Sequence, residues 1–187
     1  MHNDIKQAKE TLIKGGIICY PTDTIWGIGC DATNPEAVEK LYQIKQRDDS
    51  KSMLVILDDI GKIASYVEDM PDIAYDLLEV STEPLTIIFS EAKNLAPNLI
   101  ATDGSIGIRV IEHPWCKKLL QQFKKPIVST SANFSKAMPP ESFHQIDQKL
   151  LEKCDYVAEY ERDATIGNKP SSIIKLGNSG QVEIIRK

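Results

Sequence analysis

Two cations spaced one residue apart, Lys45 and Arg47, could hold a polyanion such as a triphosphate. Arginine grips phosphate with paired N–H groups, and lysine acts as a compact point charge. Both lie in the stretch KQRDDSK, residues 45–51, between an expected helix and an expected strand. A solvated turn would carry the same charges, and we expect both side chains to be exposed, so that they contribute little to stability. Because the chain has a net charge of −5, any polyanion site must be a local basic cluster on an acidic body.

Arg109 is the second candidate, because it stands inside the apolar stretch IGIRV, residues 106–110. An unpaired charge in such a strand would be costly to bury. A structural ion pair with an acid such as Asp103 would compensate it, and so would the carboxylate of a ligand. Both interpretations stay open at this point.

Clusters of small polar residues stand at the ends of several apolar stretches. They are PTDT (21–24), DGS (103–105), STSAN (129–133) and KPSS (169–172). Each alone is typical of a turn. Together with one strand arginine and one basic cluster, they suit a pocket that grips phosphates and a carboxylate without attacking them.

Other chemistries fit poorly. The segment GIGCDA (27–32) matches the dinucleotide fingerprint G-x-G-x-x-A, but six residues separate it from the preceding strand and the next helix begins only near residue 35. The chain contains no Walker loop and no G-x-S-x-G serine. Its three histidines have no metal-ligand spacing, and we interpret each as a solvated or capping residue; they are His2, His113 and His144.

The composition indicates one domain, residues 1–187, since 42% apolar content fills one core well. The acidic balance argues against a general nucleic-acid coat or a binder of anionic membranes. No signal peptide and no apolar run of about 20 residues is present, which predicts a cytoplasmic protein with no membrane partner. The four cysteines form no C-x-x-C pair and are interpreted as reduced, buried thiols; they are Cys19, Cys30, Cys116 and Cys154.

Hydrophobic periodicity and turn residues predict alternating helices and strands. Helices are expected between Asn3 and Gly15, and over residues 35–46, from 71, 114–120 and 143–153. Strands are expected over residues 17–20, 53–57, 85–89, 106–110, 126–130, 156–160, 171–176 and 182–186, the last two joined by a hairpin. This order predicts a single α/β domain with a mixed sheet.

Five segments in this order resemble the YrdC/TsaC family of threonylcarbamoyl-AMP synthases, in its short single-domain form. They are YPTDTIWGIGCDATNPEAVEKLYQIKQR, EPLTIIF, DGSIGIRV, VSTSAN and KPSSII. The resemblance implies a twisted mixed sheet with flanking helices around a concave, positively lined cavity. It implies a nucleotidyltransferase that converts L-threonine, bicarbonate and ATP, with Mg²⁺, to threonylcarbamoyl-AMP and pyrophosphate. The product would pass to a complex that forms threonylcarbamoyladenosine in tRNA.

The same resemblance assigns roles residue by residue. It implies that Lys45 and Arg47 are the catalytic pair on the triphosphate. The implied ATP-binding residues are Lys45, Arg47, Ser105, Ser131, Asn133 and Arg186. The implied threonine-binding residues are Thr22, Arg109, Ser129 and Ser171. Ile25 and Trp26, directly after the PTDT segment, are expected to form an apolar wall for the substrate methyl group, with core packing as the alternative.

Three departures from the family pattern bear on the pocket: Ser52-Met53, Glu83 and Ile56. Glu83 would add a carboxylate near the phosphates. One alternative is a YciO-like paralogue without synthase activity, although that group tends to lose K-x-R and the Ala-Asn of S-A-N. The other is a module that binds tRNA or double-stranded RNA weakly through the same concave face.

Overall fold

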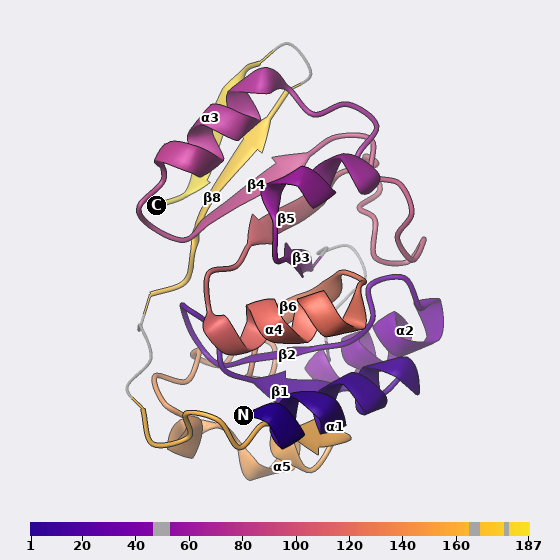
Figure 1. Ribbon diagram of the computed structural model, residues 1–187, viewed down its shortest axis with the longest axis vertical. Coiled ribbons are helices and arrows are strands. Elements are labelled where there is room, and N and C mark those ends of the chain that lie inside the picture. The colour runs from indigo at the N-terminus through magenta and orange to yellow at the C-terminus, as the bar shows by residue number, and fades with distance from the viewer. Residues whose placement is uncertain (47–52, 165–168, 178–179) are drawn as a thin grey trace.

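A nine-stranded mixed sheet in the order β7-β1-β2-β6-β3-β5-β4-β8-β9 organises the part of the chain that the structure describes. The computed structural model describes residues 1–46, 53–164, 169–177 and 180–187 (Figure 1). The strands are β1 (Ile18–Tyr20), β2 (Gly27–Gly29), β3 (Leu54–Leu57), β4 (Leu85–Phe89), β5 (Ile106–Val110), β6 (Ile127–Ser131), β7 (Tyr156–Val157), β8 (Ser172–Leu176) and β9 (Val182–Arg186).

The sheet contains both parallel and antiparallel pairs. β3 is parallel to β5 and antiparallel to β6, and β4 is antiparallel to β5 and parallel to β8. β6 connects β2 to β3 within the sheet, because its first residues pair with β3 and its last two residues pair with β2. The predicted α/β fold with a mixed sheet is confirmed.

The helices begin and end largely where the sequence places them. They are α1 (His2–Ile13), α2 (Pro35–Lys45), η1 (Ile60–Ser65), α3 (Asp72–Val80), α4 (Pro114–Phe123), η2 (Phe143–Gln145) and α5 (Gln148–Leu151). At α2 the Asn34 side chain accepts hydrogen bonds from the Glu36 and Ala37 amides at 3.0 and 3.2 Å, ahead of a proline in the first turn. α2 ends at Lys45, and Gln46 caps its C-terminus with a positive φ of 50°.

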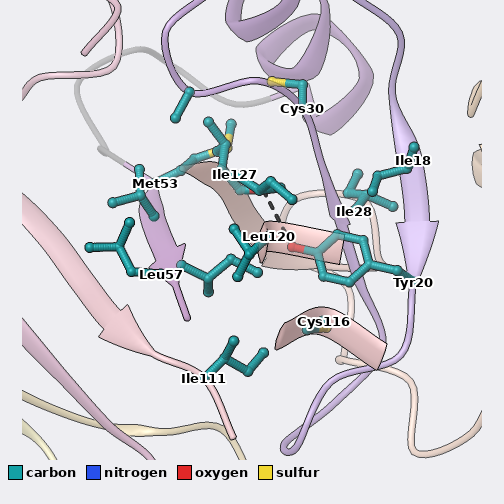
Figure 2. Close-up of a cluster of buried hydrophobic side chains, with 14 of the residues drawn as sticks. Ile18, Tyr20, Ile28, Cys30, Met53, Leu57, Ile111, Cys116, Leu120 and Ile127 are labelled. Carbon is teal, nitrogen blue, oxygen red and sulfur yellow. Dashed lines mark hydrogen bonds between the residues drawn. The ribbon is translucent and has the colours of Figure 1, made fainter. Parts of the chain in front are cut away.

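The core lies between the sheet and the helices α1 and α4, which pack against each other in front of it (Figure 1). Figure 2 shows side chains from β1, β2, β6 and α4 meeting in this core. Tyr20 reaches across it and donates to the Val128 carbonyl at 3.4 Å. The buried Asp4 carboxylate accepts from the Trp115 indole at 2.7 Å and from the Tyr156 hydroxyl, so a charge in α1 joins α4 to β7.

All four cysteines are free, and three are buried. Burial is the main cause that raises the pKa of each thiol, to about 12 for Cys154. The thiols therefore stay protonated at neutral pH, as the interpretation of inert cysteines requires. Within the described ranges, no helix combines the length and hydropathy needed to cross a membrane.

One strand was not predicted, the strand expected over residues 156–160 covers only Tyr156–Val157, and one expected helix is divided. The segment Gly27–Gly29 is a strand that pairs with β1 and β6, and glycine is needed because a Cβ at Gly29 would lie 1.9 Å from the Val128 carbonyl oxygen. The helix expected over residues 143–153 is two short pieces, η2 and α5. Ile146 has an extended backbone that ends the first piece, and the Asp147 side chain caps the second by accepting from the Lys149 amide at 2.8 Å.

Candidate functional site

A cavity of about 260 Å³ is lined mainly by residues of the sheet, from β2, β3, β4, β5, β6, β8 and β9. Side chains alternate across a strand, so every second residue of β4, β5, β6 and β8 can face it. The polar lining consists of hydroxyls and guanidinium groups: Thr22, Thr24, Thr86, Arg109, Ser129, Thr130, Ser131, Ser171 and Arg186. The apolar and glycine lining consists of Ile25, Gly27, Met53, Leu54, Ile88, Gly107, Pro139, Pro170 and Ile173. No carboxylate belongs to this lining in the described ranges, so the cavity suits anions.

The PTDT segment forms one wall through a chain of hydrogen bonds. The Arg109 Nη1 donates to Thr24 Oγ1 at 2.9 Å, and the Thr24 and Thr22 hydroxyls lie 2.9 Å apart. Thr22 donates its hydroxyl proton to the Ile25 carbonyl at 2.7 Å and accepts from the Thr24 and Ile25 amides. The Thr24 hydroxyl must therefore donate to Thr22. The Thr22 hydroxyl proton is committed to the turn, so this residue helps to shape the cavity wall.

Arg109 lies at the centre of the cavity and is only 4% exposed. Its Nη2 lies 3.4 Å from the Asp23 carboxylate, and the Asp23 Oδ2 accepts from the Glu112 amide at 3.2 Å. The Arg109 Nε is buried and has no hydrogen-bond partner in the described structure. A buried N–H without a partner is costly, and a ligand carboxylate would satisfy it.

The structural ion pair considered for Arg109 is thus with Asp23 and not with Asp103. Asp103 lies at the turn before β5, where hydrogen bonds from Ser105 and Lys175 lower the pKa of its carboxyl group. The Ser105 hydroxyl donates to this carboxylate at 2.6 Å. Ser105 lies outside the cavity lining of the described residues, so its assigned contact with ATP would require a rearrangement of this turn.

Thr86 is a cavity residue that the sequence analysis missed. It is the register partner of Arg109 on β4, and its hydroxyl lies 2.8 Å from that of Ser171. Arg186 donates from Nε and Nη2 to the Ser171 carbonyl at 3.0 and 2.7 Å. Burial is the main cause that lowers the pKa of Arg186, and repulsion from Arg109 lowers it further. The two guanidinium groups are therefore close enough to repel each other. The sequence signal that could have identified Thr86 is a hydroxyl residue inside the apolar stretch LTIIF, just as a charge inside an apolar stretch identified Arg109.

Lys45 joins the end of α2 to the STSAN loop. Its ammonium group donates to the Ser131 carbonyl at 2.7 Å and to the Asn133 carbonyl, with the Asn133 Oδ1 at 3.4 Å. The expectation of an exposed lysine was wrong, since the residue is 3% exposed. The loop carbonyls draw the ammonium group inward, beside the cavity-lining Ser131. Arg47 lies outside the described residues.

Most of the other predicted site residues line the cavity, and Trp26 does not. Ser129, Ser131, Ser171 and Arg186 line the cavity with Thr22 and Arg109. Ile25 also lines it, whereas Trp26 is fully buried and packs against Phe143 at 4.9 Å between ring centroids. The wall expected from both residues is therefore formed by Ile25 alone, and the core alternative holds for Trp26.

The departures from the family pattern also fall in different places. Met53 lines the cavity, and Ile56 is the register partner of Arg109 on β3. Glu83 does not face the cavity and lines a separate cleft with Asp23, Asp58 and Glu79. The carboxylate expected near the phosphates therefore does not belong to this cavity lining.

The mixed sheet and its hydroxyl- and arginine-lined cavity define an α/β protein whose cavity suits a small anionic ligand. A family model described as telomere recombination, for Sua5, YciO and YrdC proteins, matches residues 10–187. The chain belongs to this Sua5/YciO/YrdC family.

Individual relatives agree with this membership. A threonylcarbamoyl-AMP synthase of Pseudoalteromonas translucida is 35% identical over 181 residues, which is 95% of each chain. The crystal structure of E. coli YciO matches with a TM-score of 0.87 and 25% identity, covering 100% of this chain and 90% of that one. P. abyssi Sua5 complexed with L-threonine shares the fold, with a TM-score of 0.81 and 21% identity; the match covers 92% of this chain and 50% of that one.

Proposed function

We propose that the protein is a threonylcarbamoyl-AMP synthase, a nucleotidyltransferase that uses L-threonine, bicarbonate and ATP. The buried Arg109 Nε without a partner, inside a cavity of hydroxyls and arginines, is the observation that carries the proposal. Relatives named threonylcarbamoyl-AMP synthase, at 30–35% identity over most of the chain, support it. The cytoplasm, where ATP and tRNA are available, would be the place of the reaction.

Arg109 would bind the threonine carboxylate. Thr24 and Asp23 already hold the two terminal nitrogens, so the guanidinium plane is oriented before the ligand arrives. A carboxylate at the Nε edge would fill the remaining donor and compensate the buried charge. The fact that P. abyssi Sua5 binds L-threonine on the same fold supports this assignment. Ser129, Ser171 and Thr22 would enclose the rest of the amino acid.

The reaction needs positioning and charge neutralisation, and it needs no protein nucleophile. The threonine amine and bicarbonate give a carbamate and water, and a carbamate oxygen then attacks the α-phosphorus while the bond to pyrophosphate breaks. The protein would hold the two partners together, neutralise phosphate charge and exclude water from the labile carbamate. The protonated thiols and the lack of an activated hydroxyl in the described cavity suit this chemistry.

Lys45, Arg47 and Arg186 would neutralise the phosphates, with Ser131 and Asn133 on the same side. Mg²⁺ would accompany ATP. This ion keeps several waters and usually takes one or two carboxylates together with phosphate oxygens. The described cavity lining has no carboxylate, so the ATP phosphates, water and hydroxyls such as Ser131 would supply its ligands. When bound, it supplies further charge neutralisation for the leaving pyrophosphate.

The contact between Lys45 and Asn133 favours the synthase over a YciO-like activity. These residues come from K-x-R and S-A-N, the two segments that the YciO-like group tends to lose, and here they form one hydrogen-bonded unit. No described feature specifically favours RNA binding, and the acidic chain weighs against it. A tRNA-modifying complex would receive the adenylate, and any contact of this protein with tRNA would be weak.

Mass spectrometry of the product tests the proposal. Incubation with L-threonine, bicarbonate, ATP and Mg²⁺ should give threonylcarbamoyl-AMP and an equal amount of pyrophosphate. Salt-sensitive RNA binding with no adenylate formed from any amino acid would instead support the RNA-binding alternative.

A further inference from the structure

Two residues of β5 face the cavity, and they differ in what they place there. Arg109 projects a charged side chain, whereas Gly107, two positions earlier, projects none. Two residues along a strand span about 7 Å. Gly107 is in register with Leu54 on β3 and Ile88 on β4, and Ser129 on β6 is in register with Leu54. These four positions form a row across the cavity floor, next to the row that contains Arg109.

This row lies between the two ends of the proposed ligand. Arg109 is at the carboxylate end, and Ser131, two residues beyond Ser129 on β6, lies beside the Lys45 ammonium group at the phosphate end. In a threonylcarbamoyl adenylate, five covalent bonds separate the carboxylate carbon from the α-phosphorus, or about 6 Å when extended. A ligand anchored at Arg109 therefore brings its reacting centre over the Gly107 row.

We propose that Gly107 is a binding-site residue whose missing side chain leaves the floor open where the carbamate and the α-phosphate meet. The inference rests on the proposed function and adds a residue to it. The space around Gly107 limits the size of the side chain that fits there. A Cβ there would meet the Leu54 Cβ and the Thr86 Cγ2 at 3.4 Å, which is ordinary contact, and the backbone does not have the positive φ that favours glycine. Alanine therefore fits, and only atoms beyond Cβ enter the cavity.

A substitution series tests the inference: Gly107→Ala, Gly107→Ser and Gly107→Val. Pyrophosphate release should stay within a few-fold of wild type for alanine, fall for serine, and fall by ~10²-fold or more for valine, because small misplacements of reacting groups cost that much. Threonine affinity, measured by calorimetry without ATP, should stay within a few-fold throughout, since Arg109 and the PTDT segment are unchanged. Valine suits a strand, so the melting temperature should not fall in proportion to turnover.

Ile108→Val is the matched control, because Ile108 is the next residue of β5 and is buried on the opposite face. This control should lower the melting temperature and leave turnover intact. Equal activity of the alanine and valine variants would overturn the inference, and so would a turnover loss that only follows the melting temperature. If the valine variant does not fold, the serine variant must show the reduced turnover at a wild-type melting temperature, or the inference fails. A wild-type protein that makes no adenylate would overturn the proposed function itself, whereas an active wild type with an active valine variant refutes only the role of Gly107.

Discussion

Replacing Arg109 by lysine separates a ligand-binding arginine from a structural one. Lysine keeps the positive charge next to Asp23 but supplies a single nitrogen in place of three. In arginine, two of these contact Thr24 and Asp23, and the third, Nε, has no partner in the described structure. We expect the variant to lose at least one charge-assisted hydrogen bond to the threonine carboxylate. Such a bond contributes about 1.5–3 kcal/mol, which corresponds to a loss of roughly 10- to 150-fold in threonine affinity.

Steady-state pyrophosphate release, with threonine and ATP varied in turn, measures this effect. The KM for threonine should rise by that factor, and the KM for ATP should change far less. Arg162→Lys is the control, because Arg162 donates to the Ala158 and Val157 carbonyls away from the cavity. It should reduce stability without changing either KM. Equal losses for both substrates in Arg109→Lys would refute the reasoning and leave Arg109 as the structural partner of Asp23.

Three further predictions follow from the same geometry. Lys45→Ala should reduce pyrophosphate release by ~10²-fold or more. It should also lower the melting temperature, because the loop carbonyls lose the ammonium group that donates to them. Near-normal turnover in the folded variant would contradict the phosphate role. L-Serine should be used ~10- to 200-fold less efficiently than L-threonine in kcat/KM, and Ile25→Ala should narrow the difference, since the wall contributes only contact with one methyl group. Burial raises the pKa of the thiols in the folded state, to about 12 for Cys154, whereas thiols in the unfolded chain ionise near pH ~8.5. The free energy of unfolding should therefore be highest below pH ~8.5 and should fall as the pH rises above it. Urea titrations at pH 7 and 9.5 check this, and native thiols that react with a thiol reagent as fast as unfolded ones would contradict it.

Local signals predicted most of the fold. The helix α2 and the strands β3, β4 and β5 were predictable because their signals lie within each element. These signals are the Asn34–Pro35 cap of α2 and the apolar stretches of the three strands. β2 was missed because a strand of three residues with two glycines carries almost no periodic signal. Its existence depends on the close approach of Gly29 to β6, nearly 100 residues away in the chain.

Part of the cavity lining was predictable from the sequence, but its contacts were not. A charge inside an apolar strand marked Arg109, but its partner Asp23 comes from a loop that only the tertiary fold brings to β5. The sequence could not tell that the Lys45 ammonium group turns inward to the STSAN loop, because its exposure depends on a contact between segments more than 80 residues apart. Trp26 stands beside Ile25 in the sequence, yet the two side chains point to different sides of the wall.

The central claim is that threonine is activated through a carbamate, and the dependence on bicarbonate tests it most directly. Pyrophosphate release should be measured in carbonate-free buffer and again after addition of ¹³C-labelled bicarbonate, with the adduct identified by mass. The account predicts little release without bicarbonate, and with it an AMP adduct of L-threonine that carries the label in its carbamoyl carbon. Equal ATP consumption in carbonate-free buffer, or an unlabelled threonyl adenylate, would contradict it and indicate direct activation of the carboxylate.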